Sequence, residues 1–65
     1  MQAYQQRVVD EKVQLDDKLA KLNAFIAPTE PFQSLPQAER ERLQRQRQLM
    51  EDYSAVLGER IATFE

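Results

Sequence analysis

A chain of 65 residues forms one domain at most, and a single core of that size is only marginally stable. It contains no cysteine and no histidine, which excludes a disulfide framework, a cysteine-ligated zinc site and the usual nucleophile and base pairs of catalysis. Its formal net charge of −2 provides no overall field for nonspecific binding to nucleic acid or membranes. We therefore expect a binding protein without cofactor or metal rather than an enzyme, with self-association as the remaining means of stabilisation.

The composition is typical of a helical chain. With 31% charged residues, one glycine and three prolines, it lacks the many turn residues that a sandwich of short strands needs. The first ten residues lack the basic and apolar regions of a signal peptide, and no apolar run approaches the roughly 18 to 20 residues of a membrane span. We expect an intracellular protein that makes no membrane contact.

The first predicted element is a helix over residues 2–27. Its apolar side chains recur at intervals of three, four and seven residues, so they share one helical face. The residues of this stripe are Tyr4, Val8, Leu15, Leu19, Leu22 and Ile26. A second apolar strip lies on another side of the helix, where we expect another element or subunit to pack against it. It consists of Val9, Val13, Ala20 and Ala24.

The three prolines fall between the two periodic stretches and predict a connection over residues 28–35. Pro28 should end the first helix, because the residue before a proline avoids the α region. Ser34 and Gln37 resemble a capping box, and Pro36 suits the first turn of the next helix. Two apolar residues are expected to fold back over this end of the hairpin, namely Phe32 and Leu35.

The second predicted helix covers residues 36–64. Its stripe, in steps of three and four residues, consists of Leu43, Gln46, Met50, Tyr53, Leu57, Ile61 and Phe64. Gln46 lies in the middle of this apolar stripe, where we interpret it as a polar residue that fixes the register of an oligomer core, in preference to a ligand-binding residue. Tyr53 is interpreted mainly as a core residue, with a hydroxyl that reaches a pocket or partner as the alternative.

A short connection predicts that the two helices lie antiparallel, as in helical bundles. Pairing about Pro31 brings Leu15 close to Gln48. The same register brings two acidic residues close to two basic ones, which are Asp16, Asp17, Arg45 and Arg47. This agreement of charge supports the register.

Two helices alone bury each apolar stripe only partly. The predicted fold is therefore an all-α antiparallel two-helix hairpin that assembles into a homo-oligomeric bundle, as a four-helix dimer or a higher closed assembly. Gly58 lies in a line of small residues, and because a glycine costs about 1 kcal/mol inside a helix, we interpret it either as a site of close packing or as a tolerated surface glycine. The expected oligomer interface is Val9, Val13, Gln46, Met50, Ala55, Gly58 and Ala62.

Four arginines occur within eight residues at the start of the second helix, namely Arg40, Arg42, Arg45 and Arg47. Guanidinium groups suit phosphate or carboxylate recognition, so these residues, with Tyr53, are the candidate binding residues for an anionic ligand or partner. The helical wheel separates Arg40 and Arg47 from Arg42 and Arg45, which favours a solvated, salt-bridged face as the alternative. In an oligomer, copies of the cluster could converge.

Four segments carry a resemblance to a known family: Tyr4–Lys12, Leu15–Ile26, Phe32–Arg40 and Gln48–Ile61. Together they resemble a family of small helical-hairpin proteins from tailed bacteriophages and prophages, including crAss-like phages. The resemblance covers nearly the whole chain and transfers no site residues. It implies a phage protein that acts in the cytoplasm of an infected bacterium by stoichiometric binding.

The first functional hypothesis is an anti-defence inhibitor. Such a protein would either occlude a host defence protein or sequester an immune signalling nucleotide, for which the arginine cluster is suited. The alternatives are a structural or assembly component of the virion and a nucleic-acid-binding regulator, of which the latter is disfavoured by the acidic balance of the chain.

Overall fold

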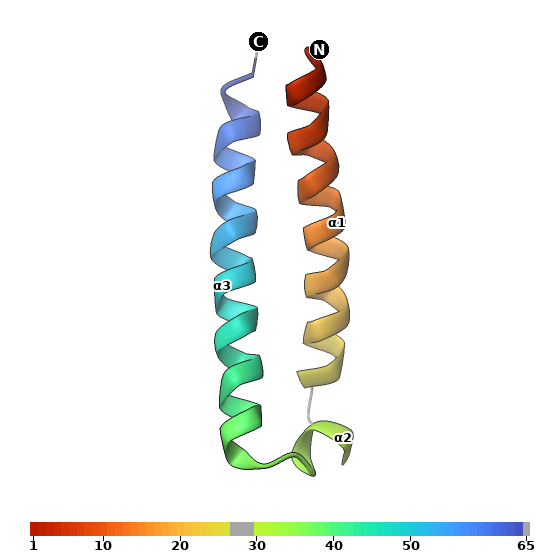
Figure 1. The fold of residues 1–65 in the computed structure, drawn as a ribbon, viewed down its shortest axis with the longest axis vertical. Coiled ribbons are helices and arrows are strands. Elements are labelled where there is room, and N and C mark those ends of the chain that lie inside the picture. The colour runs from red at the N-terminus through yellow and green to blue at the C-terminus, as the bar shows by residue number, and fades with distance from the viewer. Residues whose placement is uncertain (27–29, 65) are drawn as a thin grey trace.

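The computed structural model describes residues 1–26 and 30–64, and in them three helices: α1 (Ala3–Ile26), α2 (Glu30–Gln33) and α3 (Gln37–Ala62). The long helices α1 and α3 lie antiparallel and side by side, and α2 lies at the closed end of the hairpin (Figure 1). The start of α1 and the end of α3 lie together at the open end. The hairpin measures 47 × 14 × 14 Å. The predicted all-helical fold, with long helices packed against each other, is confirmed.

The side chains of α1 and α3 meet along a heptad stripe. In both helices the buried and half-buried residues follow alternating steps of three and four residues. The exceptions are Val9 in α1 and Glu39 and Gly58 in α3. This spacing keeps one stripe of each helix facing its neighbour, as in a coiled coil. We call these positions the seam, which consists of Gln5, Val8, Lys12, Leu15, Leu19, Leu22 and Ile26 on α1 and of Arg40, Leu43, Arg47, Met50, Ser54, Leu57, Ile61 and Phe64 on and just after α3.

The apolar core is concentrated near the two ends of the hairpin. Toward the open end, Val8 and Leu57 are 6% and 1% exposed. At the closed end, Ile26 and Phe32 are buried. Between them the seam includes polar residues, and most of its leucines are only half-buried. A single layer of two helices thus excludes water fully at only a few positions.

The predicted stripe of the second helix was wrong at two positions. Gln46 and Tyr53 are exposed, and the seam contains Arg47 and Ser54 in their place. Steps of three and four residues allow either neighbour to continue a stripe, and the strict alternation of a heptad seam selects the later one. Arg47 can occupy a seam position because its long stem covers apolar surface while its charged head reaches water.

The register of the two helices also differs from the predicted pairing about Pro31. Lys12 Nζ donates to Ser54 Oγ at 2.9 Å, so the chain turns about residue 33, midway between them. The predicted contacts of Asp16 and Asp17 with the arginines of α3 do not form, because these carboxylates pair with Lys12 and Lys21 of their own helix at 2.8 and 3.1 Å. Within the predicted connection, Glu30–Gln33 form the helical turn α2.

The start of α3 differs from the predicted capping box. Pro36 is the N-cap residue, with φ −55° and ψ 147°, and no side chain caps the helix. Ser34 Oγ instead donates to the carbonyl oxygen of Glu30, because α2 places that acceptor one turn away at 2.8 Å. Glu39 lies in the first turn of α3, as expected from its favourable interaction with the helix dipole.

Phe32 closes the end of the hairpin, as predicted. It is 4% exposed, and its ring meets that of Phe25 edge to face, with centroids 6.2 Å apart. Leu35 is half-buried at the same end. Pro28, which was predicted to end the first helix, lies outside the described ranges.

Across the described ranges, every helix is too short or too polar to pass through a bilayer.

Candidate functional site

The four clustered arginines divide between two sides of α3. Arg40 and Arg47 belong to the seam, and Arg42 and Arg45 point outward. Arg42 Nε donates to Glu39 Oε1 at 2.9 Å, which makes an exposed ion pair one turn apart. The cluster therefore does not form one continuous patch within a single chain, and Arg40 is the member that lines a concavity at the closed end.

Arg40 lines a concavity of about 320 Å³ at the closed end, where α2 meets the start of α3. The lining residues are Phe32, Gln33, Gln37, Arg40, Glu41 and Gln44. The Arg40 Nε atom is buried and has no hydrogen-bond partner among the described residues. A buried donor without an acceptor costs free energy.

The other groups of this concavity suit a polar, anionic ligand. Gln33, Gln37 and Gln44 contribute side-chain amides, which can both donate and accept hydrogen bonds. The one carboxylate of the lining, Glu41, accepts from Gln37 Nε2 at 3.2 Å. The first turn of α3 adds the positive end of a 26-residue helix dipole. We call this concavity the Arg40 site.

Tyr53 does not belong to the Arg40 site. It lies 13 residues further along α3, which at the helical rise amounts to about 20 Å. Its side chain is exposed, as is that of Gln46, whose amide contacts the sulfur of Met50 at 3.8 Å. The sequence placed Arg40 among four candidate guanidinium groups, but could not show which of them lines this concavity, because that depends on α2.

The predicted interface residues do not share one surface of the hairpin. By their heptad positions, Val9, Val13, Ala55, Gly58 and Ala62 lie on the side that carries Asp16, Gln46 lies on the opposite side, and Met50 is in the seam. The neighbour of Gly58 within the chain is Lys12, because a Cβ added to Gly58 would lie 3.4 Å from Lys12 Cε. The missing side chain of Gly58 thus leaves room for the stem of Lys12 to cross the seam.

Three polar side chains form a closed cluster across the seam, which the sequence analysis did not predict. Lys12 Nζ donates to Asp16 Oδ2 at 2.8 Å and to Ser54 Oγ at 2.9 Å, and Ser54 Oγ donates to Asp16 Oδ1. Ser54 is 9% exposed, so its hydroxyl depends on these partners. The available signal in the sequence for this cluster was that Lys12 and Ser54 are polar residues at seam positions of the two helices.

The cluster makes stability depend on pH through Asp16. Hydrogen bonds from Lys12 and Ser54 lower the pKa of the Asp16 carboxyl below its ordinary value of 3.8. A carboxyl whose pKa is lowered by folding stabilises the folded state above the unfolded-state pKa, and this contribution is lost as the pH falls through the folded-state value. Asp16→Asn should therefore lower the urea midpoint at neutral pH, and the difference from the parent protein should vanish well below pH 3.8.

Asp17→Asn is the matched control for this pH dependence. Asp17 pairs with Lys21 in a solvent-exposed ion pair, with side-chain exposures of 64% and 77%. Exposed ion pairs of this kind contribute little to folding stability, so Asp17→Asn should leave the urea midpoint nearly unchanged. A difference between Asp16→Asn and the parent that persists unchanged in acid would contradict this role of the carboxylate.

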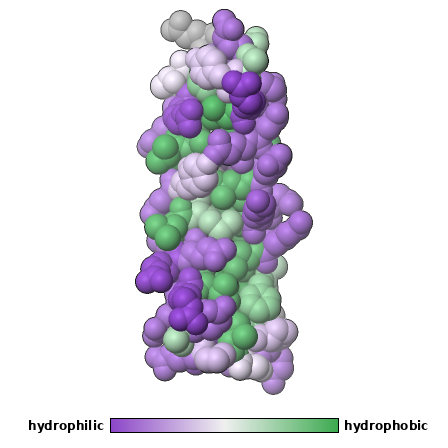
Figure 2. All heavy atoms as spheres, in the orientation of Figure 1, coloured by the Kyte–Doolittle hydropathy of each residue, from purple (hydrophilic) through white to green (hydrophobic). Residues whose placement is uncertain are grey.

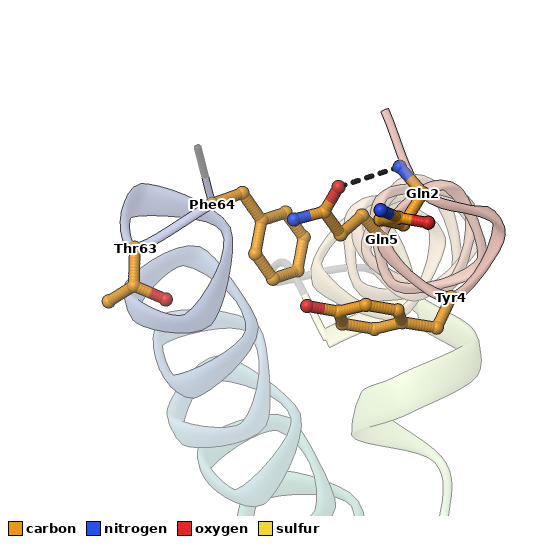
Figure 3. Close-up of a pocket in the computed structure, with 5 residues that line it drawn as sticks. All are labelled: Gln2, Tyr4, Gln5, Thr63 and Phe64. Carbon is orange, nitrogen blue, oxygen red and sulfur yellow. Dashed lines mark hydrogen bonds between the residues drawn. The ribbon is translucent and has the colours of Figure 1, made fainter.

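A second concavity, of about 350 Å³, lies at the open end between the start of α1 and the segment after α3 (Figure 3). Its lining residues are Gln2, Tyr4, Gln5, Thr63 and Phe64. Gln5 is buried, and its Oε1 accepts from the backbone nitrogen of Gln2 at 2.7 Å. The rings of Tyr4 and Phe64 meet edge to face, with centroids 5.9 Å apart. No charged side chain is among these lining residues, so an anion is better accommodated at the Arg40 site.

Within the described ranges, no three acidic, histidine or cysteine side chains are grouped so that they could hold a metal ion. The fold is that of a small helical hairpin, with a concavity lined by Arg40 at its closed end. A family model described as Sequestin matches residues 2–63, so the chain belongs to the Sequestin family. Comparisons with curated proteins and with solved structures find no match.

Proposed function

We propose that the protein is a phage-encoded inhibitor that sequesters an anionic nucleotide of host immune signalling in the cytoplasm of an infected bacterium. It acts stoichiometrically and as a self-associated assembly, without catalysing a reaction. The family description implies a sequestering role, and the resemblance to small phage proteins provides the setting. The Arg40 site supplies the recognition chemistry.

The observation that carries the proposal is the buried Arg40 Nε without a partner. A guanidinium presents its N–H groups in one plane and binds phosphate oxygens in pairs, so the Arg40 side chain that lines the concavity supplies the chemistry for a phosphate contact. The surrounding glutamine amides can hydrogen-bond the sugar and base of a nucleotide, and Phe32 forms an apolar wall. The volume of the concavity, about 320 Å³, is at the lower end of the range for small-molecule sites.

The alternative of a host defence protein as target is supported by a different observation. Several large apolar side chains are exposed on α3, including Leu49 and Val56, and surfaces of this kind take part in protein contacts. In that case the inhibitor would bind its target through α3, with no dependence on Arg40. The nucleic-acid and virion alternatives have no comparable support from the described residues.

Arg40→Gln tests the proposed nucleotide binding. We expect the parent protein to bind cyclic mononucleotides or cyclic dinucleotides in isothermal titration calorimetry, and to melt at a higher temperature in their presence. Because a hydrogen bond to a charged group contributes about 1.5–3 kcal/mol, Arg40→Gln should weaken this binding by about 10- to 100-fold.

Arg7→Gln is the matched control, because Arg7 is an exposed arginine of α1 near the open end, far from the Arg40 site. It changes the net charge by the same amount and should leave nucleotide affinity unchanged. Equal losses in both variants would indicate a general charge effect. Absence of binding to any nucleotide, with recovery of a host protein by the tagged inhibitor from infected cells, would replace the nucleotide proposal with the protein-target alternative.

A further inference from the structure

A second heptad stripe runs along α3 beside the seam. Each of its residues immediately precedes a seam residue, so it has the same spacing and lies on a different side of the helix. Its three central members are the exposed apolar residues Leu49, Tyr53 and Val56, at 61%, 44% and 49% exposure. Along α3, the polar residue Gln46 precedes these three residues and the polar residue Arg60 follows them. We call these five residues the outer stripe.

The face that carries the outer stripe shows hydrophobic side chains on the α3 side and along the line between the two helices, bordered by hydrophilic ones (Figure 2). A heptad stripe with an apolar centre is the pattern by which one helix packs against another. Within the chain, α1 contacts α3 through the seam. The outer stripe therefore has the spacing of a helix-packing surface and no described helix against it.

The outer stripe is complementary to itself when a second α3 runs in the opposite direction. With Tyr53 near the two-fold axis, Leu49 lies opposite Val56 of the partner subunit, and this contact occurs twice. Gln46 then lies opposite Arg60 of the partner subunit, where the amide oxygen can accept from the guanidinium. Isologous dimers require such matching of a surface with its own copy.

The charges beside the outer stripe select the antiparallel direction. Arg45 and Glu59 occupy the outer flank of α3, and neither forms a salt bridge with another described residue. An antiparallel partner brings Arg45 close to Glu59 of the partner subunit in two symmetric pairs, whereas a parallel partner would oppose like charges. Asp52 meets its own copy at the axis, and Gln48 Nε2, which donates to Asp52 Oδ1 at 3.1 Å, partly offsets this repulsion.

We infer that the outer stripe is the interface of an antiparallel homodimer, in which two α3 helices pack about a two-fold axis near Tyr53. The inference rests on the proposed self-association and is independent of nucleotide binding at the Arg40 site. It leaves the Arg40 site of each chain at opposite ends of the four-helix assembly, because Arg40 lies at the closed end of each hairpin. It also replaces the interface predicted from Val9, Val13 and the small residues of α3, which lies on another side.

Sedimentation velocity of the full chain tests the interface. The parent protein should be a dimer at micromolar concentration, and Tyr53→Glu should dissociate it while far-UV circular dichroism keeps its helical signal, since Tyr53 is exposed. Val13→Glu is the matched control because Val13 is 63% exposed on the opposite side, and it should leave the dimer intact.

A charge exchange tests the direction of packing. Arg45→Glu and Glu59→Arg should each weaken the dimer about tenfold, and the double variant should restore it. A dimer broken by Val13→Glu but not by Tyr53→Glu would overturn the interface and leave self-association standing. A monomeric parent protein would overturn both, whereas nucleotide binding that depends on Arg40 would still support the sequestering site.

Discussion

Leu57→Ala should remove most of the stability of the hairpin. Leu57 is the most buried side chain described, at 1% exposure, and the register set by Lys12 and Ser54 places it close to Val8 across the seam. Truncation of a buried leucine loses its transfer free energy and leaves a cavity, at a cost of about 2–5 kcal/mol. A domain of this size has only about 3–5 kcal/mol from its core, so the variant should be largely unfolded at room temperature.

Urea denaturation followed by circular dichroism measures this effect, with Leu49→Ala as the matched control. Leu49 is the same residue type on the same helix at 61% exposure. At a protein concentration too low for association, Leu49→Ala should cost less than about 1 kcal/mol, because little of its surface is buried within the chain. Equal costs at the two positions would contradict the seam as described.

Phe32→Ala should have an effect of similar size at the other end of the molecule. Phe32 is 4% exposed, contacts Phe25 edge to face and lines the Arg40 site. Loss of a buried phenylalanine costs about 3–5 kcal/mol. Because Phe32 is the buried residue of α2 and its ring packs against Phe25 of α1, the variant should also loosen the turn that positions Arg40.

Hydrogen exchange of the start of α3, together with the urea midpoint, measures both consequences. Phe32→Leu keeps most of the apolar volume and should recover much of the lost stability. Gln33→Ala changes the next residue of α2, which is exposed, and should leave the midpoint within about 0.5 kcal/mol of the parent protein. Normal protection of α3 in Phe32→Ala would show that the closed end does not depend on this ring.

The sequence predicted the architecture because helical periodicity and proline positions are local signals. The main error of the prediction concerned the second helix. The predicted stripe mixed residues of two separate stripes, the seam and the outer stripe. Gln46 and Tyr53 belong to the outer stripe, whereas Leu43, Met50 and Leu57 belong to the seam. Spacings of three and four residues are shared by both stripes, so periodicity along one helix cannot separate them without the position of the other helix.

The candidate site was predictable only as a residue type. Arginine marks affinity for anions, but the concavity at Arg40 arises because α2 folds one helical turn against the start of α3. The cluster of Lys12, Asp16 and Ser54 also depends on α2. With α2 in the connection, the helices pair about residue 33, and this register brings Lys12 to Ser54. A turn of four residues that carries a proline has too weak a pattern to be recognised in advance.

Both ends of the described chain emerge at the same end of the hairpin (Figure 1). The rings of Tyr4 and Phe64 meet at this end (Figure 3). A tensile load applied between them would act across the helices rather than along them. The structure would then open like a zipper, one pair of side chains at a time, from the aromatic contact toward Phe32. Resistance to pulling would be low at every stage, because no stage requires many contacts to break together.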